Sequence, residues 1–251
     1  RAVVRYALRL ARYRSYRDSG SKQLLADMKF THADRVVPDL AFSYPVDVAE
    51  PGVEGAKETL KVGISPIAYL RKGHWPKTDG GIFERYCETL QAFTTELVRR
   101  GHEVVLFATD APDREVSELV AAQVKAACGQ SNGRLKLRIA PISRVHELLA
   151  ELKTLDCVVA SRLHGVILSH LCLRPVLAIS YDRKVTRHMN DMEQANYCLD
   201  FHTLDVAQLV KTFESLALRR DAVTAILKRR THAYRTELKS QYDDLARRVD
   251  L

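Results

Sequence analysis

The stretch "DCVVASRLHGVILSHLCLRPVLAISYD", residues 156–182, decides the fold class. It holds two short apolar runs, 157–160 and 176–179, and the residues between them have the length and apolar content of a buried helix. A strand, a helix and a second strand of this kind are typical of a parallel sheet that is buried on both faces. Arg162 and His164 follow the first run directly, in the turn that leads into the helix.

The same alternation continues on both sides of this stretch. Strands are expected at 60–65, 102–109 and 134–140, and helices at 81–101, 113–128, 143–155 and 183–192. The tail from about 205 to 250 has the pattern of helix with a charged outer face. The sequence therefore predicts an α/β fold, with a Rossmann-type parallel sheet covered by helices on both faces and a linker at 47–58 before it.

Charge and cysteine content narrow the class of protein. The chain has 39 Lys and Arg against 31 Asp and Glu, a formal charge of +8, which favours anionic partners. Nucleic acid is not expected among them, because no zinc-finger spacing or aromatic RNA-binding motif accompanies the basic residues. The five cysteines form no CxxC pair and indicate free thiols in a reducing cytoplasm. No apolar run is long enough to predict a membrane span, and the first residue, Arg1, indicates a fragment or a processed chain.

Side chains with functional potential gather where the predicted strands end. In an open α/β sheet, ligands bind beyond the carboxyl ends of the strands, at the starts of helices. A helix start offers N–H groups and a partial positive charge, and an arginine fork adds donors for phosphate or carboxylate. Arg162 and His164 therefore predict an anion site beside a proton-transfer group. The same edge is expected to receive Ser65, Tyr69, His74 and Trp75 after one strand, and Tyr181, Asp182 and Lys184 after another.

Plainer interpretations of these residues remain open. An arginine at a helix start can simply pair with a neighbouring acid. A histidine near a strand end can be a core residue, and Lys184 can be a solvated lysine in the first turn of a helix.

Residues 1–17 predict a basic amphipathic helix, with Arg1, Arg5, Arg9 and Arg12 on one stripe. Such a stripe is typical of peripheral contact with an anionic membrane surface. It is more commonly a feature of an ordinary domain helix with a solvated cationic face.

Four segments, taken together and in this order, resemble the polysaccharide pyruvyltransferase family: "YRSYRDSGSKQLL" (13–25), "VVPDLAF" (36–42), "RRGHEVVLFATDAPDRE" (99–115) and 156–192. The resemblance implies a GT-B-like fold of two Rossmann-type domains. Residues 1–50 would be the end of a truncated N-terminal domain, and 51–251 the C-terminal domain that carries the "RLHG" motif. It also implies phosphoenolpyruvate as the donor substrate and a sugar diol, free or in a lipid-linked oligosaccharide, as the acceptor.

Site residues follow from the resemblance by position. The family's donor pocket corresponds to Arg17, Arg162, Leu163 and His164, and Lys184 is a candidate for a third cation. Separate cations suit phosphoenolpyruvate, which carries a carboxylate and a phosphate on adjacent atoms. Histidine titrates near neutral pH, so His164 is expected to act as acid and base, while Arg162 stabilises charge on the leaving phosphate.

The resemblance to the pyruvyltransferase family also implies which cofactors the protein needs and where in the cell it acts. The reaction needs no metal or organic cofactor. The enzyme is expected in the cytoplasm, where it can lie peripherally at the inner face of the plasma membrane and act on a precursor of an exopolysaccharide or cell-wall polysaccharide.

Two other functions stay open on the sequence alone. A nucleotide-sugar glycosyltransferase would share the two-domain architecture and the phosphate site at a helix start, but it would release a nucleoside diphosphate. A catalytically silent carbohydrate-binding protein would bind sugar and release no phosphate.

Overall fold

The computed structural model describes residues 1–47, 58–129 and 135–248. The chain divides into two compact units, one formed by Arg1–Pro45 together with Arg229–Leu251, the other by Val46–Lys228. The predicted linker at 47–58 lies almost entirely outside the described residues. The assignment of residues 1–50 and 51–251 to two Rossmann-type domains stays a prediction.

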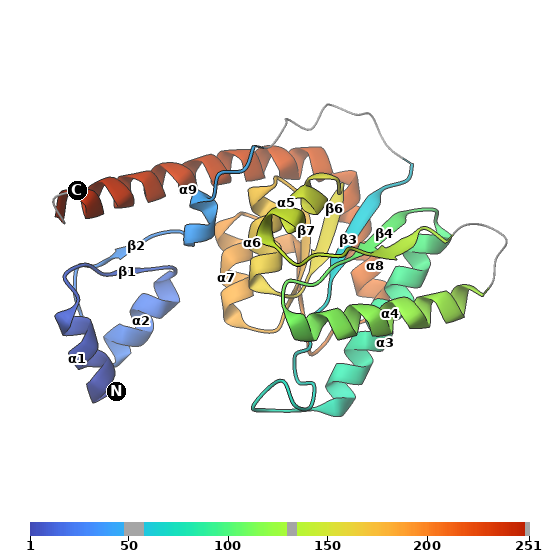
Figure 1. Cartoon of the computed structure of the whole chain (residues 1–251), viewed down its shortest axis with the longest axis horizontal. Coiled ribbons are helices and arrows are strands. Elements are labelled where there is room, and N and C mark those ends of the chain that lie inside the picture. Colours follow the sequence, from blue (N-terminus) through green and yellow to red (C-terminus); the bar gives the residue numbers. More distant parts are fainter. Residues whose placement is uncertain (48–57, 130–134, 249–251) are drawn as a thin grey trace. The chain divides into compact units, whose positions relative to one another are not determined.

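The second unit is built on a six-stranded parallel sheet (Figure 1). The strands run in the order β5-β4-β3-β6-β7-β8, and each neighbouring pair is parallel. In chain order this is the 3-2-1-4-5-6 arrangement of a Rossmann sheet. The strands are β3 (Lys61–Ser65), β4 (Glu103–Leu106), β5 (Leu137–Ile139), β6 (Cys157–Ala160), β7 (Val176–Ser180) and β8 (Cys198–Asp200).

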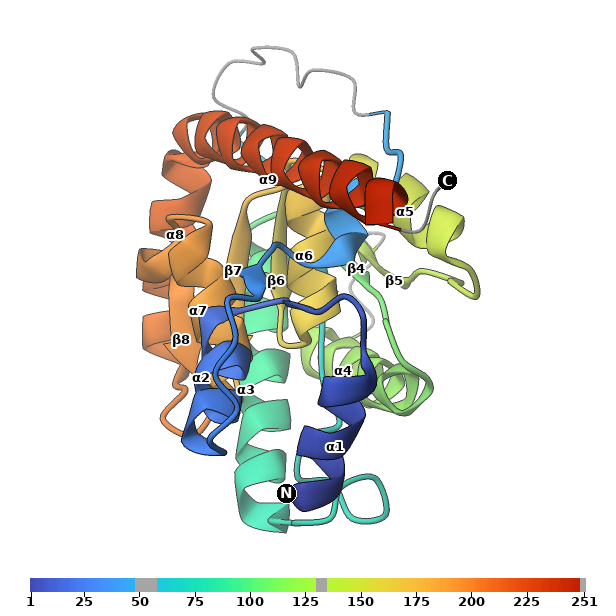
Figure 2. The same cartoon turned by 90° about the vertical axis from the view of Figure 1, so that its left-hand side faces the viewer.

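Helices cover both faces of this sheet (Figures 1 and 2). Connections from β3 toward β5 and from β6 toward β8 run in opposite directions, and right-handed crossovers therefore place their helices on opposite faces. On one face α3 (Gly80–Arg99) packs against α4 (Ala111–Cys128) and α8 (Val206–Leu218). On the other, α6 (Leu163–Leu171) packs against α5 (Val145–Lys153) and α7 (Arg183–Asp191). The predicted α/β fold with helices on both faces is confirmed.

Burial explains why the central strands are continuous apolar runs. Every residue of β6 and β7 is buried, because helices cover both sides of the sheet. β8 was not predicted, since its three residues, Cys-Leu-Asp, are too short to show a pattern. The predicted helical tail is two helices, α8 and α9 (Arg220–Arg248), which meet at Arg219.

Gly63 lies in the middle of β3, where a side chain does not fit. A Cβ atom at this position would overlap Leu155 Cδ1 and lie 3.0 Å from Phe107 Cε1, and both neighbours are buried. We expect Gly63→Ala to lower the free energy of unfolding by about 1–3 kcal/mol, the usual cost of overpacking, in urea denaturation. Gly80→Ala is the control, because only Glu84 Oε1, at 4.0 Å, lies near its Cβ position. Equal stability of Gly63→Ala and wild type would contradict this account.

The first unit consists of short elements and the last part of α9. Its elements are α1 (Ala2–Leu10), β1 (Ser15–Tyr16), α2 (Ser19–Asp27), β2 (Arg35–Val36) and the 3-10 helix η1 (Leu40–Ser43), and β1 pairs with β2 in parallel. The helix predicted over 1–17 is shorter than expected. It ends at Leu10 because the Arg14 guanidinium binds the carbonyls of Leu8 and Ala11, at 2.8 and 2.6 Å.

The C-terminal part of α9 completes the interior of the first unit. The Tyr234 ring lies edge-on to the ring of buried Phe42, with centroids 5.0 Å apart. Arg235 Nε donates to the Phe42 carbonyl at 3.3 Å, and Gln241 Nε2 donates to Ser15 Oγ at 2.9 Å. This unit is therefore made from the two ends of the chain.

Candidate functional site

The carboxyl ends of β3 and β6 form the switch point of the sheet, because the chain leaves these neighbouring strands in opposite directions. Buried polar groups join the loops that follow them. The Tyr86 hydroxyl accepts a hydrogen bond from the Ile67 N–H at 3.1 Å and lies 2.7 Å from Ser161 Oγ. Burial raises the pKa of Tyr86, so its hydroxyl stays protonated at this junction.

Arg162 is the N-cap residue of α6, and two carboxylates hold its guanidinium. Nε and Nη2 donate to the two oxygens of Asp113, the second at 3.1 Å, and Nη2 lies 2.9 Å from Asp110 Oδ2. The Asp113 side chain is fully buried, whereas that of Asp110 is 50% exposed. The pairing with a neighbouring acid, one of the interpretations left open above, is thus present in this structure.

Burial and pairing act in opposite directions on these charges. Burial raises the pKa of Asp113, and the hydrogen bonds from Arg162 and from the Ala68 N–H, at 2.9 Å, offset only part of that effect. Burial lowers the pKa of Arg162, but the bonds and charges of Asp113 and Asp110 outweigh it and leave the value raised. Arg162 therefore stays cationic, and Asp113 compensates its partly buried charge.

The first turn of α6 carries the other residues that the sequence analysis selected. Leu163 is buried and His164 is exposed. At Gly165, a Cβ atom would lie 3.5 Å from Ser65 Oγ. Ser65 is 1% exposed, and its hydroxyl has no hydrogen-bond partner among the described residues. The structure thus brings Arg162, Leu163 and His164 to one helix start at the switch point, and their roles toward a donor stay predictions.

A second helix start repeats the residue order of the first. Ser143-Arg144-Val145-His146 leads into α5 as Ser161-Arg162-Leu163-His164 leads into α6. The helix predicted from 143 begins at Val145, because Arg144 takes the N-cap position.

The residue that follows the histidine differs between the two helices: it is Glu147 in α5 and Gly165 in α6. Glu147 of α5 accepts hydrogen bonds from the Ser143 and Arg144 N–H groups, at 2.8 and 3.0 Å, so this helix supplies its own anion. These same bonds lower the pKa of Glu147. In α6 the corresponding residue is Gly165, and the first turn holds no acidic side chain. Of the two starts, α6 is the one whose own sequence leaves room for an anion from outside.

Aromatic rings and a lysine lie at the same edge, after β3, β7 and β8. The Tyr69 ring centroid is 5.1 Å from that of Trp75, 4.9 Å from Tyr181 and 5.2 Å from Phe201.

Lys184 lies in the first turn of α7, and its Nζ atom is 5.2 Å from the Tyr181 ring centroid. Because α6 and α7 follow neighbouring strands and pack together, Lys184 and Arg162 belong to adjacent helix starts.

Arg17 belongs to the first unit, just before α2. Its side chain is 42% exposed, with Nη1 3.4 Å from Asp39 Oδ2 and Nε 3.9 Å from Asp18 Oδ2. Its role in the same pocket as Arg162 stays a prediction.

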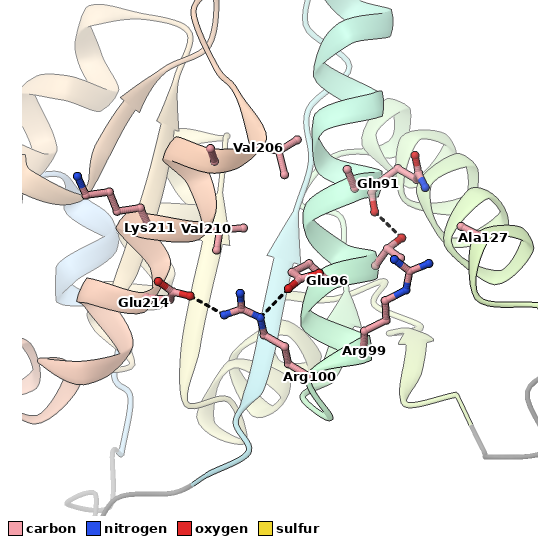
Figure 3. A pocket seen from close by; sticks show the side chains of 12 residues that line it. Gln91, Glu96, Arg99, Arg100, Ala127, Val206, Val210, Lys211 and Glu214 are labelled. Atoms are coloured by element: carbon pink, nitrogen blue, oxygen red, sulfur yellow. Dashed lines mark hydrogen bonds and ion pairs between the residues drawn. The ribbon is translucent and has the colours of Figure 1, made fainter.

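Two cavities of the second unit differ in their relation to this edge. One, of about 400 Å³, is lined by Thr109, Asp110 and Ser143 among others and lies at the carboxyl ends of β4 and β5. The other, of about 630 Å³, lies between α3 and α8 (Figure 3). In it Arg100 bridges Glu96, at 2.8 Å, and Glu214, at 2.5 Å. None of the residues selected above is among those that line the second cavity.

Within residues 1–47, 58–129 and 135–248, no group of three or more His, Cys, Asp or Glu side chains is arranged to hold a metal ion. No helix in these ranges combines the length and apolar character needed to cross a bilayer.

An open sheet in Rossmann order, with an arginine at the helix start of its switch point, defines a doubly wound α/β protein. The solved structures that it resembles, described below, make this fold GT-B-like. The matched residues identify the family. The model of the polysaccharide pyruvyl transferase family matches residues 1–183, and the chain belongs to this family of transferases. No curated protein matches the sequence.

Solved structures confirm the fold class. The α,α-trehalose-6-phosphate synthase of Burkholderia multivorans is 10% identical over 94% of this chain and 59% of its own, with a TM-score of 0.55. The UDP-forming α,α-trehalose-phosphate synthase of Burkholderia vietnamiensis is 11% identical over 94% and 61%, with a TM-score of 0.52. Another trehalose-6-phosphate synthase is 12% identical over 92% and 59%, with a TM-score of 0.57. The chain thus spans about 60% of the length of these proteins.

Proposed function

We propose that the protein transfers a pyruvyl group from phosphoenolpyruvate to two hydroxyls of a sugar, forming a pyruvate ketal on a precursor of an exopolysaccharide or cell-wall polysaccharide. The observation that carries this proposal is the family match, which includes the segment from Arg162 to Gly165 at the switch point. A helix start with an arginine fork and a neighbouring lysine suits a donor with two anionic groups.

The chemistry assigns a role to each group. A proton goes to the methylene carbon of the enol phosphate, which becomes the methyl group, and a sugar hydroxyl attacks the adjacent carbon. The bond to phosphate then breaks as the second hydroxyl closes the ring, and the two hydroxyl protons replace the proton used and protonate the phosphate. His164 is the acid and base, because it is exposed two residues after Arg162. Arg162 holds the phosphate and stabilises its growing charge.

The proposed reaction also has consequences for the protein's cofactors, its acceptor and its location in the cell. The reaction uses no metal or organic cofactor and involves no nucleic acid. Its acceptor is a sugar or a lipid-linked oligosaccharide that offers a diol, and the enzyme works in the cytoplasm, at the inner face of the plasma membrane.

Mass spectrometry tests the proposed reaction directly. The full-length protein is incubated with phosphoenolpyruvate and a panel of aryl and lipid-linked glycosides, and phosphate release is followed in parallel. A glycoside that gains one pyruvyl group, with one phosphate released, is the expected result. Release of a nucleoside diphosphate from a nucleotide sugar would instead identify a glycosyltransferase. Sugar binding without either product would identify a silent binding protein.

Arg17→Ala should raise the donor KM by roughly tenfold or more, because a hydrogen bond to a charged group would be lost from ground and transition states alike. Steady-state kinetics at varied phosphoenolpyruvate measure it. Arg12→Ala, an exposed arginine nearby in the chain, is the control. If KM stays unchanged in a folded Arg17→Ala protein, the residue belongs to the surface.

Helix α1 predicts weak, salt-sensitive binding to anionic lipid. Its apolar side chains Val3, Tyr6 and Leu10 are exposed, and no residue of the helix is buried. Each arginine near an anionic surface contributes about 1 kcal/mol, and salt screens that attraction. In a flotation assay with vesicles of anionic lipid, the protein should float with the vesicles at low salt but not at high salt. Replacing Arg1, Arg5, Arg9 and Arg12 with glutamine should abolish flotation, and absence of binding at both salt concentrations would leave only the solvated-face interpretation.

A further inference from the structure

The two acids on Arg162 differ in how firmly they are held. Asp113 is fully buried, binds Nε and Nη2 together, and accepts a third hydrogen bond from the Ala68 N–H. Asp110 is half exposed and touches only Nη2. Its other oxygen caps α4 by accepting from the Ala111 N–H at 2.9 Å. An entering anion can therefore turn Asp110 out into solvent, whereas displacing Asp113 would leave a buried carboxylate unpaired.

We infer that Asp113 is a positioning residue that fixes the Arg162 guanidinium at the start of α6, and that Asp110 is a displaceable stand-in for the anionic group of the donor. This inference rests on the proposed function and deepens it. With both acids in place the cluster of Arg162, Asp110 and Asp113 carries more negative than positive charge, which opposes an anion. Release of Asp110 removes that repulsion and frees one N–H of Nη2 for the ligand, while Asp113 keeps the other, and the return of Asp110 helps to expel the phosphate product.

Neither acid was selected by the sequence analysis, although both follow β4 at the same edge as the other site residues. Asp110 and Asp113 stand at the N-cap and in the first turn of α4, which explains them locally as helix-start residues. Their second role appears only when α4 and α6 are brought together, since Asp113 lies 49 positions before Arg162.

Inorganic phosphate is the probe, measured by calorimetric titration of the whole chain. Asp110→Asn keeps a good N-cap residue and removes the charge. It should tighten phosphate binding roughly fivefold, the effect of one unit charge about 4 Å away in water. Glu118→Gln, the same change of charge on the exposed side of α4, should leave the affinity unchanged. Unchanged affinity in Asp110→Asn, an equal gain in Glu118→Gln, or no phosphate binding to either protein would overturn the inference.

A double-mutant cycle tests the role of Asp113. Asp113→Asn and Arg162→Gln should each weaken phosphate binding, and the double variant should bind no more weakly than Arg162→Gln alone, because Asp113 acts through Arg162. Additive losses would show that Asp113 acts elsewhere. If Asp113→Asn does not fold, Asp113→Glu takes its place, since it keeps the charge but moves the carboxylate.

Kinetics separate this inference from the proposed function. With phosphoenolpyruvate turned over, Asp110→Asn should lower the donor KM and strengthen product inhibition by phosphate, an effect that a merely structural residue would not produce. If no pyruvyl transfer occurs at all, the proposed function fails, while the phosphate titrations still decide whether Asp110 competes for Arg162.

Discussion

Replacing His164 with asparagine should lower kcat by about 10² to 10⁴, the usual loss when a general acid or base is removed, while much of the donor binding remains. Asparagine keeps a polar side chain at the exposed second position of α6, so the fold should be unaffected. Steady-state kinetics at varied phosphoenolpyruvate measure both kcat and the remaining donor binding.

His146→Asn is a matched control, because His146 is exposed at the same position of α5, after the same Ser-Arg order. It should leave kcat unchanged. A folded His164→Asn enzyme with wild-type kcat would mean that the proton comes from another group.

Arg162→Lys should cost about 2–4 kcal/mol of transition-state stabilisation, seen as a loss of kcat/KM on the order of 30- to 1,000-fold. An ammonium group is a single point charge. It cannot keep two donors on Asp113 and still present a directed donor to the phosphate. The change therefore removes both the held geometry and the anion contact. Kinetics at varied phosphoenolpyruvate give the loss, and thermal unfolding shows whether the variant is folded.

Arg144→Lys provides the comparison, since Arg144 is the N-cap of α5 as Arg162 is of α6. The start of α5 is already filled by the Glu147 carboxylate, so no effect on donor use is expected there. Kinetics of Arg162→Lys that match both wild type and Arg144→Lys would remove Arg162 from the site.

The local pattern of apolar residues in the sequence was enough to predict the central strands of the sheet, which are buried on both faces. β6 and β7 were visible as apolar runs because each of their residues faces a helix layer. β8 was not visible, since it pairs with β7 over only three residues. The end of α1 was also missed, because it depends on a side chain four residues beyond it, Arg14, that turns back to the helix carbonyls.

The candidate site, like the fold, could be predicted from the sequence only in part. The placement of Arg162 and His164 at a helix start follows from the strand-turn-helix pattern of residues 157–171. The partners of Arg162 do not follow from it, because many acids precede the motif and only the packed sheet decides which of them face it. The contrast between Glu147 and Gly165 was readable in the sequence as a repeated Ser-Arg-x-His order, but its meaning needed the capping hydrogen bonds of α5.

The composition of the first unit has a consequence for the order of events on the ribosome. Its interior joins Phe42 and Ser15 to Tyr234 and Gln241, so some of its contacts come from residues that are synthesised about 190 positions or more later. The whole second unit is translated in between, at about 5–20 residues per second, which is a delay on the order of ten seconds or more. During that time residues 1–45 lack the α9 residues that complete their unit, whereas the six-stranded sheet of the second unit can already fold. Of these two units, the one whose synthesis starts earlier is therefore the one that is completed later.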